Sequence, residues 1–390
     1  IKGFGVKKTM ESSSGGHGFP LKSPTELSAF IAEIYGGQPF PDEFKSWIQE
    51  LIDEEARLKA LGKKDSGEKI QKGVSAALIK ARKEGLPVIS VISDLPGSTG
   101  VAEFRKAYPE ASIDVGVAEA NMISSAAGLS KLGFIPVVDT FAQFGVTKGA
   151  LPHIMASLSH APMIAIYSHT GFQDAADGAS HQALSYYAMM ASIPHVDCYA
   201  LSCSEEAEHL VYQAVIQFRD KRIAGEVPHS KIFFLGRENF PRNYGAEVKY
   251  RLGSSQILRD QTQNGSRNVL IIAVGSMVPQ ALMASDELKS LGVGTIVLHP
   301  STLNSLDESC VLPSVKRCEG RIVTIEDHQL ICGYGQFLSH QLTLRGVHHR
   351  MKSLAVCGEF GRSAYTAMAL YEHYGLGPRD IVKAAQSLLG

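Results

Sequence analysis

Phe134-Ile-Pro-Val-Val-Asp139 and Pro162-Met-Ile-Ala-Ile-Tyr-Ser168 are two short apolar runs, and residues 145–158 between them have helical spacing. Uninterrupted runs of this kind are typical of parallel strands that are covered on both faces. Parallel neighbours need a crossover connection, which a helix between them supplies. This stretch therefore predicts a β-α-β unit inside a doubly wound sheet.

The same alternation continues on both sides of this unit and predicts one domain over residues 67–246. Further apolar runs lie at residues 87–94 and 231–235, and further helices are expected at residues 115–132, 182–191 and 204–218.

A second domain is predicted over residues 247–390, after a polar and irregular boundary at residues 241–265. Its strands are expected at residues 268–274, 294–298, 320–325 and 352–356, and its helices at residues 277–291, 335–344 and 378–389. The predicted fold class is α/β, with two successive doubly wound, mostly parallel-sheet domains.

Residues 1–66 read as a loop followed by a helical connector. Residues 1–24 are rich in Gly, Ser and Lys, whereas residues 42–61 have amphipathic helical spacing. The chain starts at Ile1 with what reads as the end of a strand, so we expect it to be a piece of a longer polypeptide.

Charge and composition exclude several classes of partner. The 38 Lys and Arg residues nearly balance the 39 Asp and Glu residues, and no basic run is interleaved with aromatics, so neither nucleic acid nor an anionic membrane is expected. No apolar run reaches the ~20 residues of a membrane span, and no signal peptide is visible. The six cysteines form no Cys-x-x-Cys pair or zinc-site spacing, which favours a reduced, cytoplasmic protein.

Polar side chains gather where the predicted strands end. Ligands of open parallel sheets bind beyond the carboxyl ends of the strands, which here are Asp94, Asp139-Thr-Phe141 and Ser168-His169. The loop 169–182 adds a second histidine and two aspartates. No Gly-x-Gly-x-x-Gly follows a first strand and no Walker A sequence is present, so neither a dinucleotide nor a P-loop site is predicted.

Three segments together resemble the transketolase family of thiamine-diphosphate enzymes: Gly116-Val-Ala-Glu119-Ala-Asn-Met, Asp139-Thr-Phe141-Ala-Gln-Phe144 and Asp177-Gly-Ala-Ser-His181-Gln182. Order, spacing and topology agree over the whole chain. The resemblance implies that residues 67–246 bind the aminopyrimidine ring and that residues 247–390 are the family's C-terminal domain. Residues 1–66 would hold the tail of the diphosphate-binding domain and a connector.

The resemblance also assigns cofactor-binding residues. Glu119 would hydrogen-bond the pyrimidine ring of thiamine diphosphate and promote formation of the ylid, the carbanion that the cofactor supplies. Phe141 and Phe144 would pack against that ring. Asp94, at the end of its strand, is also predicted to bind the cofactor. A third aromatic, common a few residues later in transketolases, is replaced here by Thr147 or a neighbour.

Substrate-binding and catalytic residues follow from the same matches. His169 and His181 would bind substrate oxygens and assist proton transfers, and Asp177 would receive a sugar hydroxyl. His17, in His-Gly-Phe-Pro-Leu-Lys22, would supply a further catalytic histidine. Arg237 would pair with the substrate phosphate. An arginine and a serine-bearing insertion that transketolases usually have are missing, so the phosphate is held differently or the substrate is not a usual sugar phosphate.

The diphosphate half of the cofactor site is expected outside this chain. In the family a Gly-Asp-Gly…Asn motif holds the diphosphate through a divalent metal, and no such motif is present. Mg²⁺ and its ligands would come from an N-terminal segment or a separate subunit, in a homodimer or a heterotetramer. The segments Thr324-Ile-Glu326-Asp-His328 and residues 357–363 resemble parts of the family that shape interfaces, so a structural role is expected for them.

The sequence therefore predicts a transketolase-type transfer of a two-carbon ketol unit from a ketose, or its phosphate, to an aldose. Two alternatives stay open. Deoxyxylulose-phosphate synthases and β subunits of 2-oxo-acid dehydrogenases share the sheet and the glutamate but use 2-oxo acids. A non-catalytic assembly subunit would have lost the cofactor.

Overall fold

β4 (Ile135–Phe141), α8 (Ala142–Leu158) and β5 (Ile164–Ser168) form the β-α-β unit that the sequence predicts. β4 and β5 pair in parallel, with Val138 opposite Ala165 and Phe141 opposite Ser168. Both strands are almost entirely buried, as expected for strands covered on both faces.

The computed structural model describes residues 6, 7, 21, 23–60, 67–263, 265, 267–300 and 302–390. It divides into two compact units, residues 1–66 and 67–390. In the first, the Ser23 hydroxyl caps α2 (Pro24–Ile34) by accepting a hydrogen bond from the Glu26 amide, and α3 (Asp42–Ala60) follows. His17, a predicted catalytic residue, lies outside the described residues.

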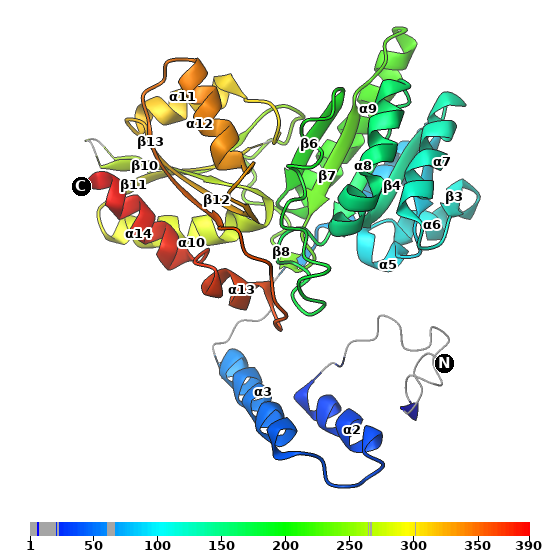
Figure 1. Ribbon diagram of the computed structural model, residues 1–390. Helices are drawn as coiled ribbons and strands as arrows, with labels where there is room; N and C mark the ends of the chain where they lie inside the picture. Colours follow the sequence, from blue (N-terminus) through cyan, green and yellow to red (C-terminus); the bar gives the residue numbers. More distant parts are fainter. Residues whose placement is uncertain are drawn as a thin grey trace. The chain divides into compact units, whose positions relative to one another are not determined.

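The first sheet has six parallel strands in the order β3-β2-β4-β5-β7-β6 (Figure 1). Its remaining strands are β2 (Val88–Ile92), β3 (Ser112–Asp114), β6 (Val196–Leu201) and β7 (Ser230–Leu235).

Helices cover both faces of this sheet. Val137 packs in the layer beneath α4 (Gln71–Lys83) and α9 (Ser204–Ile223). Its neighbour Val138 packs in the layer beneath α7 (Glu119–Lys131) and α8. This alternation is what two-sided burial of a strand requires, because successive side chains point to opposite faces.

Short elements surround the carboxyl end of the sheet. α5 (Pro96–Thr99), α6 (Ala102–Ala107) and the 3₁₀ turn η1 (Pro109–Ala111) connect β2 to β3. β1 (Glu68–Lys69) pairs antiparallel with β8 (Asn239–Phe240). This pairing brings Lys69 to Arg237, whose carbonyl accepts a 2.7 Å hydrogen bond from the Lys69 ammonium.

The second sheet has five strands in the order β13-β12-β10-β11-β9, all parallel except β9. The strands are β9 (Gln256–Asp260), β10 (Asn268–Ala273), β11 (Gly294–His299), β12 (Arg321–Gln329) and β13 (Arg350–Val356). This confirms the predicted fold class of two mostly parallel α/β sheets.

Helices also cover both faces of the second sheet (Figure 1). One layer contains α10 (Val278–Ser290), which follows the turn η2 (Gly275–Met277), and α14 (Pro378–Leu389), and the other contains α11 (Glu308–Arg317) and α12 (Tyr334–Leu344). The short helix α13 (Ala367–His373) precedes α14. Within the described residues, no helix combines the length and apolar character needed to cross a bilayer.

Two sequence predictions about local structure are wrong. Residues 182–191 form consecutive turns instead of a helix. Their buried side chains Tyr186, Tyr187 and Met190 belong to the core cluster that also includes residues of both sheets. Residues 241–265 are not wholly irregular, because β9 lies within them and forms the antiparallel edge of the second sheet.

Candidate active site

Glu119 is the first residue of α7 and is 5% exposed. The turn before it is held by Asp114, whose Oδ1 accepts hydrogen bonds from the amides of Asp94 (3.2 Å) and Gly116 (2.9 Å). Gly116 has φ +70°, a conformation that side chains disfavour. Among the described residues, no hydrogen bond or ion pair engages the Glu119 carboxylate. Its oxygens are not among the fully buried unpaired atoms of the described residues, so they remain accessible to a ligand that could complete their bonding.

Phe141, Phe144, His169 and His181 come together at the carboxyl ends of β4 and β5. The ring of Phe141 stacks on His169 at 4.0 Å between centroids, and the ring of Phe144 meets His181 edge-on at 5.1 Å. Phe141 and Phe144 lie 6.5 Å apart with nearly parallel rings. Four residues predicted to serve one site are thus joined in a continuous aromatic wall.

His169 is buried and held in a left-handed backbone conformation with φ +63°. Its Nδ1 lies 2.8 Å from the Ser168 hydroxyl. Burial, with the positive charges of Arg237 and Lys69, holds the pKa of His169 well below its ordinary value. The imidazole is therefore neutral at physiological pH and exchanges hydrogen bonds rather than carrying a charge.

Asp174 forms an ion pair with Arg237, with 2.7 Å between Oδ1 and the guanidinium. The aspartate is fully buried, and burial followed by the charge of Asp177 raises the pKa of Asp174 to about 6. The sequence prediction assigned a role to Asp177, which is exposed, and missed Asp174. The signal in the sequence was a second aspartate in the same histidine loop.

Gln173 fixes the position of the Arg237 segment. Its Oε1 accepts hydrogen bonds from the amides of Arg237 (3.0 Å) and Glu238 (2.8 Å), and its Nε2 lies 2.8 Å from the Tyr371 hydroxyl. That hydroxyl in turn donates to Asp327 of β12 at 3.0 Å. The C-terminal sheet thus supports the loop that carries the site.

Gln182 closes the same loop. Its amide nitrogen donates to the carbonyl of Arg362 at 2.9 Å, and a side chain at Gly361 would collide with Gln182 Oε1. A larger residue at position 361 would displace the Gln182 amide and its hydrogen bond to Arg362. This contact is consistent with the structural role expected for that segment.

A pocket of about 640 Å³ opens between α4 and the α5 turn and reaches Arg237 and His169. Its wall is shaped by hydrogen bonds from Gln71 to the Gly236 carbonyl (3.1 Å) and from Ser75 to the Gly100 carbonyl (2.6 Å). Of the predicted site residues that the structure describes, only His169 and Arg237 line it. Asp94 is exposed, and its backbone amide anchors Asp114.

Asp139 is a second buried carboxyl group at this end of the sheet. The Thr99 hydroxyl donates to its Oδ2, whereas its Oδ1 is buried without a partner among the described residues. Burial raises the pKa of Asp139 to about 8. Across the described residues, no three His, Cys, Asp or Glu side chains are arranged to hold a metal ion.

Residues 68–224 match the family model of the transketolase pyrimidine binding domain, and residues 260–381 match that of the transketolase C-terminal domain. A split gene transketolase, described as an inactive β4 tetramer, aligns with a TM-score of 0.67 at 25% identity. The alignment covers 83% of this chain and 99% of that chain.

Similar proteins differ in length. A transketolase C-terminal section of Methanocaldococcus jannaschii is 29% identical, covering 80% of this chain and 94% of that protein. Human transketolase-like protein 2 is 31% identical, covering 76% of this chain and 47% of that protein. A 1-deoxy-D-xylulose-5-phosphate synthase of Heliobacterium modesticaldum is 26% identical, covering 80% and 46%.

The chain thus spans about half the length of the human and Heliobacterium relatives and nearly all of the archaeal section. Both matched domains lie where the two parallel sheets lie, and the Glu119 turn, the aromatic wall and the histidine loop fall within the first of them. The chain therefore belongs to the transketolase family, of which it carries the pyrimidine-binding and C-terminal domains.

Proposed function

We propose that this chain is the pyrimidine-binding and C-terminal part of a transketolase-type enzyme, which transfers a two-carbon ketol unit from a ketose to an aldose. The observation that carries the proposal is Glu119, a buried carboxylate that begins α7 and has no protein partner among the described residues. Such a group suits the aminopyrimidine of thiamine diphosphate, which offers a ring nitrogen to hydrogen-bond.

Thiamine diphosphate, when bound, supplies the nucleophilic carbon for ketol transfer. Glu119 holds the pyrimidine nitrogen, and Phe141 and Phe144 provide an apolar wall for the ring. Ile123 of α7 and Tyr167 of β5 pack against Gly149 and Gly145 of α8, where a larger side chain would collide with them. This chain therefore binds and orients the cofactor through the first turn of α7 and the end of β4.

His169 and His181 bind the substrate through hydrogen bonds in this proposal. His169 is neutral, so it can accept a hydrogen bond or donate one at Nε2, while Nδ1 is engaged by Ser168. His181 lies at the edge of the Phe144 ring and is only half-buried, which leaves it accessible to a sugar oxygen. Asp177, exposed on the same loop, would accept a hydrogen bond from a sugar hydroxyl. The catalytic role of His17 stays a prediction.

Arg237 is the proposed contact for an anionic substrate end. It borders the 640 Å³ pocket together with Lys69, and its side chain is 40% exposed despite its ion pair with Asp174. The exposed donors can pair with phosphate, for which a guanidinium fork is suited. The ion pair with Asp174 orients the side chain toward the pocket.

The diphosphate site and Mg²⁺ would come from an N-terminal segment or subunit, in a homodimer or a heterotetramer. Relatives that are separate C-terminal sections or split-gene subunits support this arrangement. α8 also presents an exposed apolar row, in which Leu151 is 66% and Leu158 is 71% exposed. A face of this kind suits a partner subunit. The cytoplasmic location expected from the sequence stays a prediction.

A 2-oxo-acid-using enzyme is the second candidate, because a deoxyxylulose-phosphate synthase aligns over 80% of the chain. A test reconstitutes the chain with its N-terminal complement, thiamine diphosphate and Mg²⁺, and supplies either a ketose phosphate or pyruvate as the donor. Turnover of the ketose alone is expected. Turnover of pyruvate alone would establish the second candidate. No binding of thiamine diphosphate in calorimetry, either with or without the N-terminal complement, would instead support an assembly subunit.

A further inference from the structure

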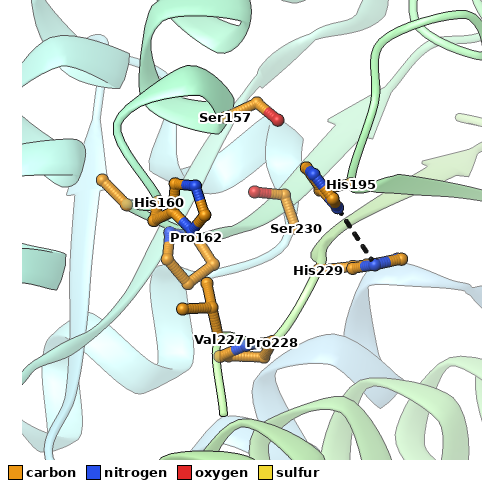
Figure 2. A pocket seen from close by; sticks show the side chains of 9 residues that line it. Ser157, His160, Pro162, His195, Val227, Pro228, His229 and Ser230 are labelled. Carbon is orange, nitrogen blue, oxygen red and sulfur yellow. Dashed lines mark hydrogen bonds between the residues drawn. The ribbon is translucent and has the colours of Figure 1, made fainter.

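Three histidines surround a pocket of about 260 Å³ at the amino ends of β5, β6 and β7. His169 lies at the opposite, carboxyl end of β5. His160 follows α8, His195 immediately precedes β6 and His229 immediately precedes β7. Figure 2 shows His160 on one side of this space and the His195–His229 pair on the other. Nothing in the ketol-transfer proposal uses these residues.

The nitrogen atoms of two of these histidines are spaced for a shared metal ion. His195 Nδ1 lies 3.4 Å from His229 Nε2, which is long for a hydrogen bond between nitrogens. Zinc binds histidine nitrogen at about 2.0–2.1 Å in tetrahedral geometry, which places two such nitrogens about 3.3–3.4 Å apart. The two rings are inclined at 63° with centroids 5.2 Å apart, so their lone pairs can converge.

Asp197 contacts one member of this pair, His229. Its Oδ1 lies 3.0 Å from His229 Nδ1, and its Oδ2 accepts a hydrogen bond from Lys231, which is 4% exposed. A carboxylate that accepts from the Nδ1–H of His229 leaves the lone pair of that ring on Nε2, which faces His195. Carboxylate-backed histidines of this kind are the usual metal ligands.

His160 can complete the site. Its ring centroid is 6.1 Å from that of His195, and both residues have left-handed backbone conformations, with φ +52° and +60°. No three ligands converge as the side chains stand in the described chain, so the proposed site requires the His160 side chain to turn toward the other two histidines. Water would fill the fourth position, since the pocket is open to solvent at His160.

We propose that His195 and His229, oriented by Asp197 and joined by His160, bind a divalent transition metal of the class that prefers imidazole, with Zn²⁺ as the leading candidate. The site differs chemically from one for Mg²⁺, which requires oxygen ligands. A bound ion would tie the α8–β5 connection to the starts of β6 and β7. It would thereby brace the strands whose opposite ends carry His169 and Arg237. The inference does not depend on the proposed ketol transfer.

The test titrates Zn²⁺ into the full chain by calorimetry, without thiamine diphosphate or Mg²⁺, and repeats it with Co²⁺ to record its visible absorption spectrum. The wild type is expected to bind one more equivalent than the His195→Ala/His229→Ala variant, with a tetrahedral Co²⁺ spectrum. Asp197→Asn should weaken that equivalent by about 10- to 100-fold. His340→Ala, which removes an exposed histidine of α12, should leave it unchanged.

Equal stoichiometry and affinity in the wild type and the double-histidine variant would overturn the site. Loss of the extra equivalent when the exposed thiols are removed in Cys332→Ser/Cys357→Ser would overturn it as well. The histidines are surface residues, with His229 46% exposed, so the variants are expected to fold. Equal metal-free melting temperatures check this, and a metal-induced rise in melting temperature confined to chains with both histidines gives a second readout.

Discussion

Arg237 and Asp174 illustrate how single residues in the site depend on each other. The arginine faces the pocket, whereas its aspartate partner is fully buried. Truncating the arginine alone would therefore do two things: remove a cation from the pocket and strand a buried carboxylate. The two effects must be separated before Arg237 can be assigned to a substrate anion.

The Arg237→Ala/Asp174→Asn variant makes that separation. If Arg237 binds the phosphate end, the KM for a phosphorylated ketose should rise by about 10- to 100-fold, because a hydrogen bond to a charged group is lost. The KM for an unphosphorylated ketose should change little. Steady-state kinetics with Asp174→Asn as the control checks this, and an equal rise for both donors would contradict it.

Asp139 predicts a pH dependence of stability. Burial raises its pKa from 3.8 to about 8, so between these pH values the folded chain binds a proton that the unfolded chain has released. Stability then falls as pH rises through this interval. Asn at position 139 keeps an acceptor for Thr99 without the charge.

The melting temperature of Asp139→Asn relative to the wild type should therefore increase from pH 5 to pH 9. Other carboxyl groups titrate equally in both proteins and cancel in this difference. A difference that stays constant, or one that shrinks toward pH 9, would show that the carboxylate is not destabilising in the folded chain.

Residues 182–191 have the pattern of a helix but form turns in the structure. Ala183, Tyr186, Tyr187 and Met190 have the spacing of an amphipathic helix, and all four are buried. In the structure these residues lie in a series of turns, from which the Tyr187 hydroxyl donates a hydrogen bond to Glu326 of the second sheet. A tertiary hydrogen bond overrides the local pattern, and periodicity alone cannot reveal such a bond.

The inner strands of both sheets and the edge strand β13 were predicted, whereas the edge strands β3, β6 and β9 were not. β2, β4, β5, β7 and β10 each contain a short apolar run, so the sequence alone locates them. β3 is three residues long and largely exposed, and β9 lies in a polar segment, so neither has a strand pattern. β3 is recognised as a strand by its pairing with β2, and β9 by its pairing with β11.

Tyr187→Phe tests the tie between the two sheets. The Tyr187 hydroxyl donates to Glu326, whose other partners are the amides of Tyr334 and Gly335. Removing one donor from a fully buried carboxyl group should lower the free energy of unfolding by about 1–3 kcal/mol. Urea denaturation measures it, with Tyr212→Phe as control because that hydroxyl bonds an exposed glutamate. Equal effects of the two substitutions on the free energy of unfolding would show that the hydrogen bond between Tyr187 and Glu326 does not stabilise the contact between the sheets.

At the scale of the whole molecule, the family motifs in the sequence locate most of the candidate site. Glu119, Phe141, Phe144, His169 and His181 were predicted, and the structure brings the last four together. The Asp174–Arg237 pair and the pocket walls at Gln71 and Ser75 were not. Those contacts join residues far apart in the chain, and no local pattern marks them.

Assembly with a partner makes a prediction about the exposed row of α8. Leu151→Asp/Leu158→Asp places charges on two side chains that are 66% and 71% exposed, so the fold should survive while association weakens. Light scattering after size-exclusion chromatography should show a smaller species than the wild type. Leu344→Asp, which changes a leucine of α12 that is also 66% exposed, is the control. An unchanged mass for the α8 variant would place the interface elsewhere.

The most direct test of the proposed function is the ketol-transfer rate of the reconstituted holoenzyme with Glu119→Gln. Because Glu119 is proposed to activate the cofactor, the rate with a ketose donor should fall by at least about 100-fold. Glu287→Gln, which changes an exposed glutamate of α10, should leave the rate unchanged. A Glu119→Gln enzyme that retains the wild-type rate, with thiamine diphosphate bound and the fold intact, would contradict the central claim.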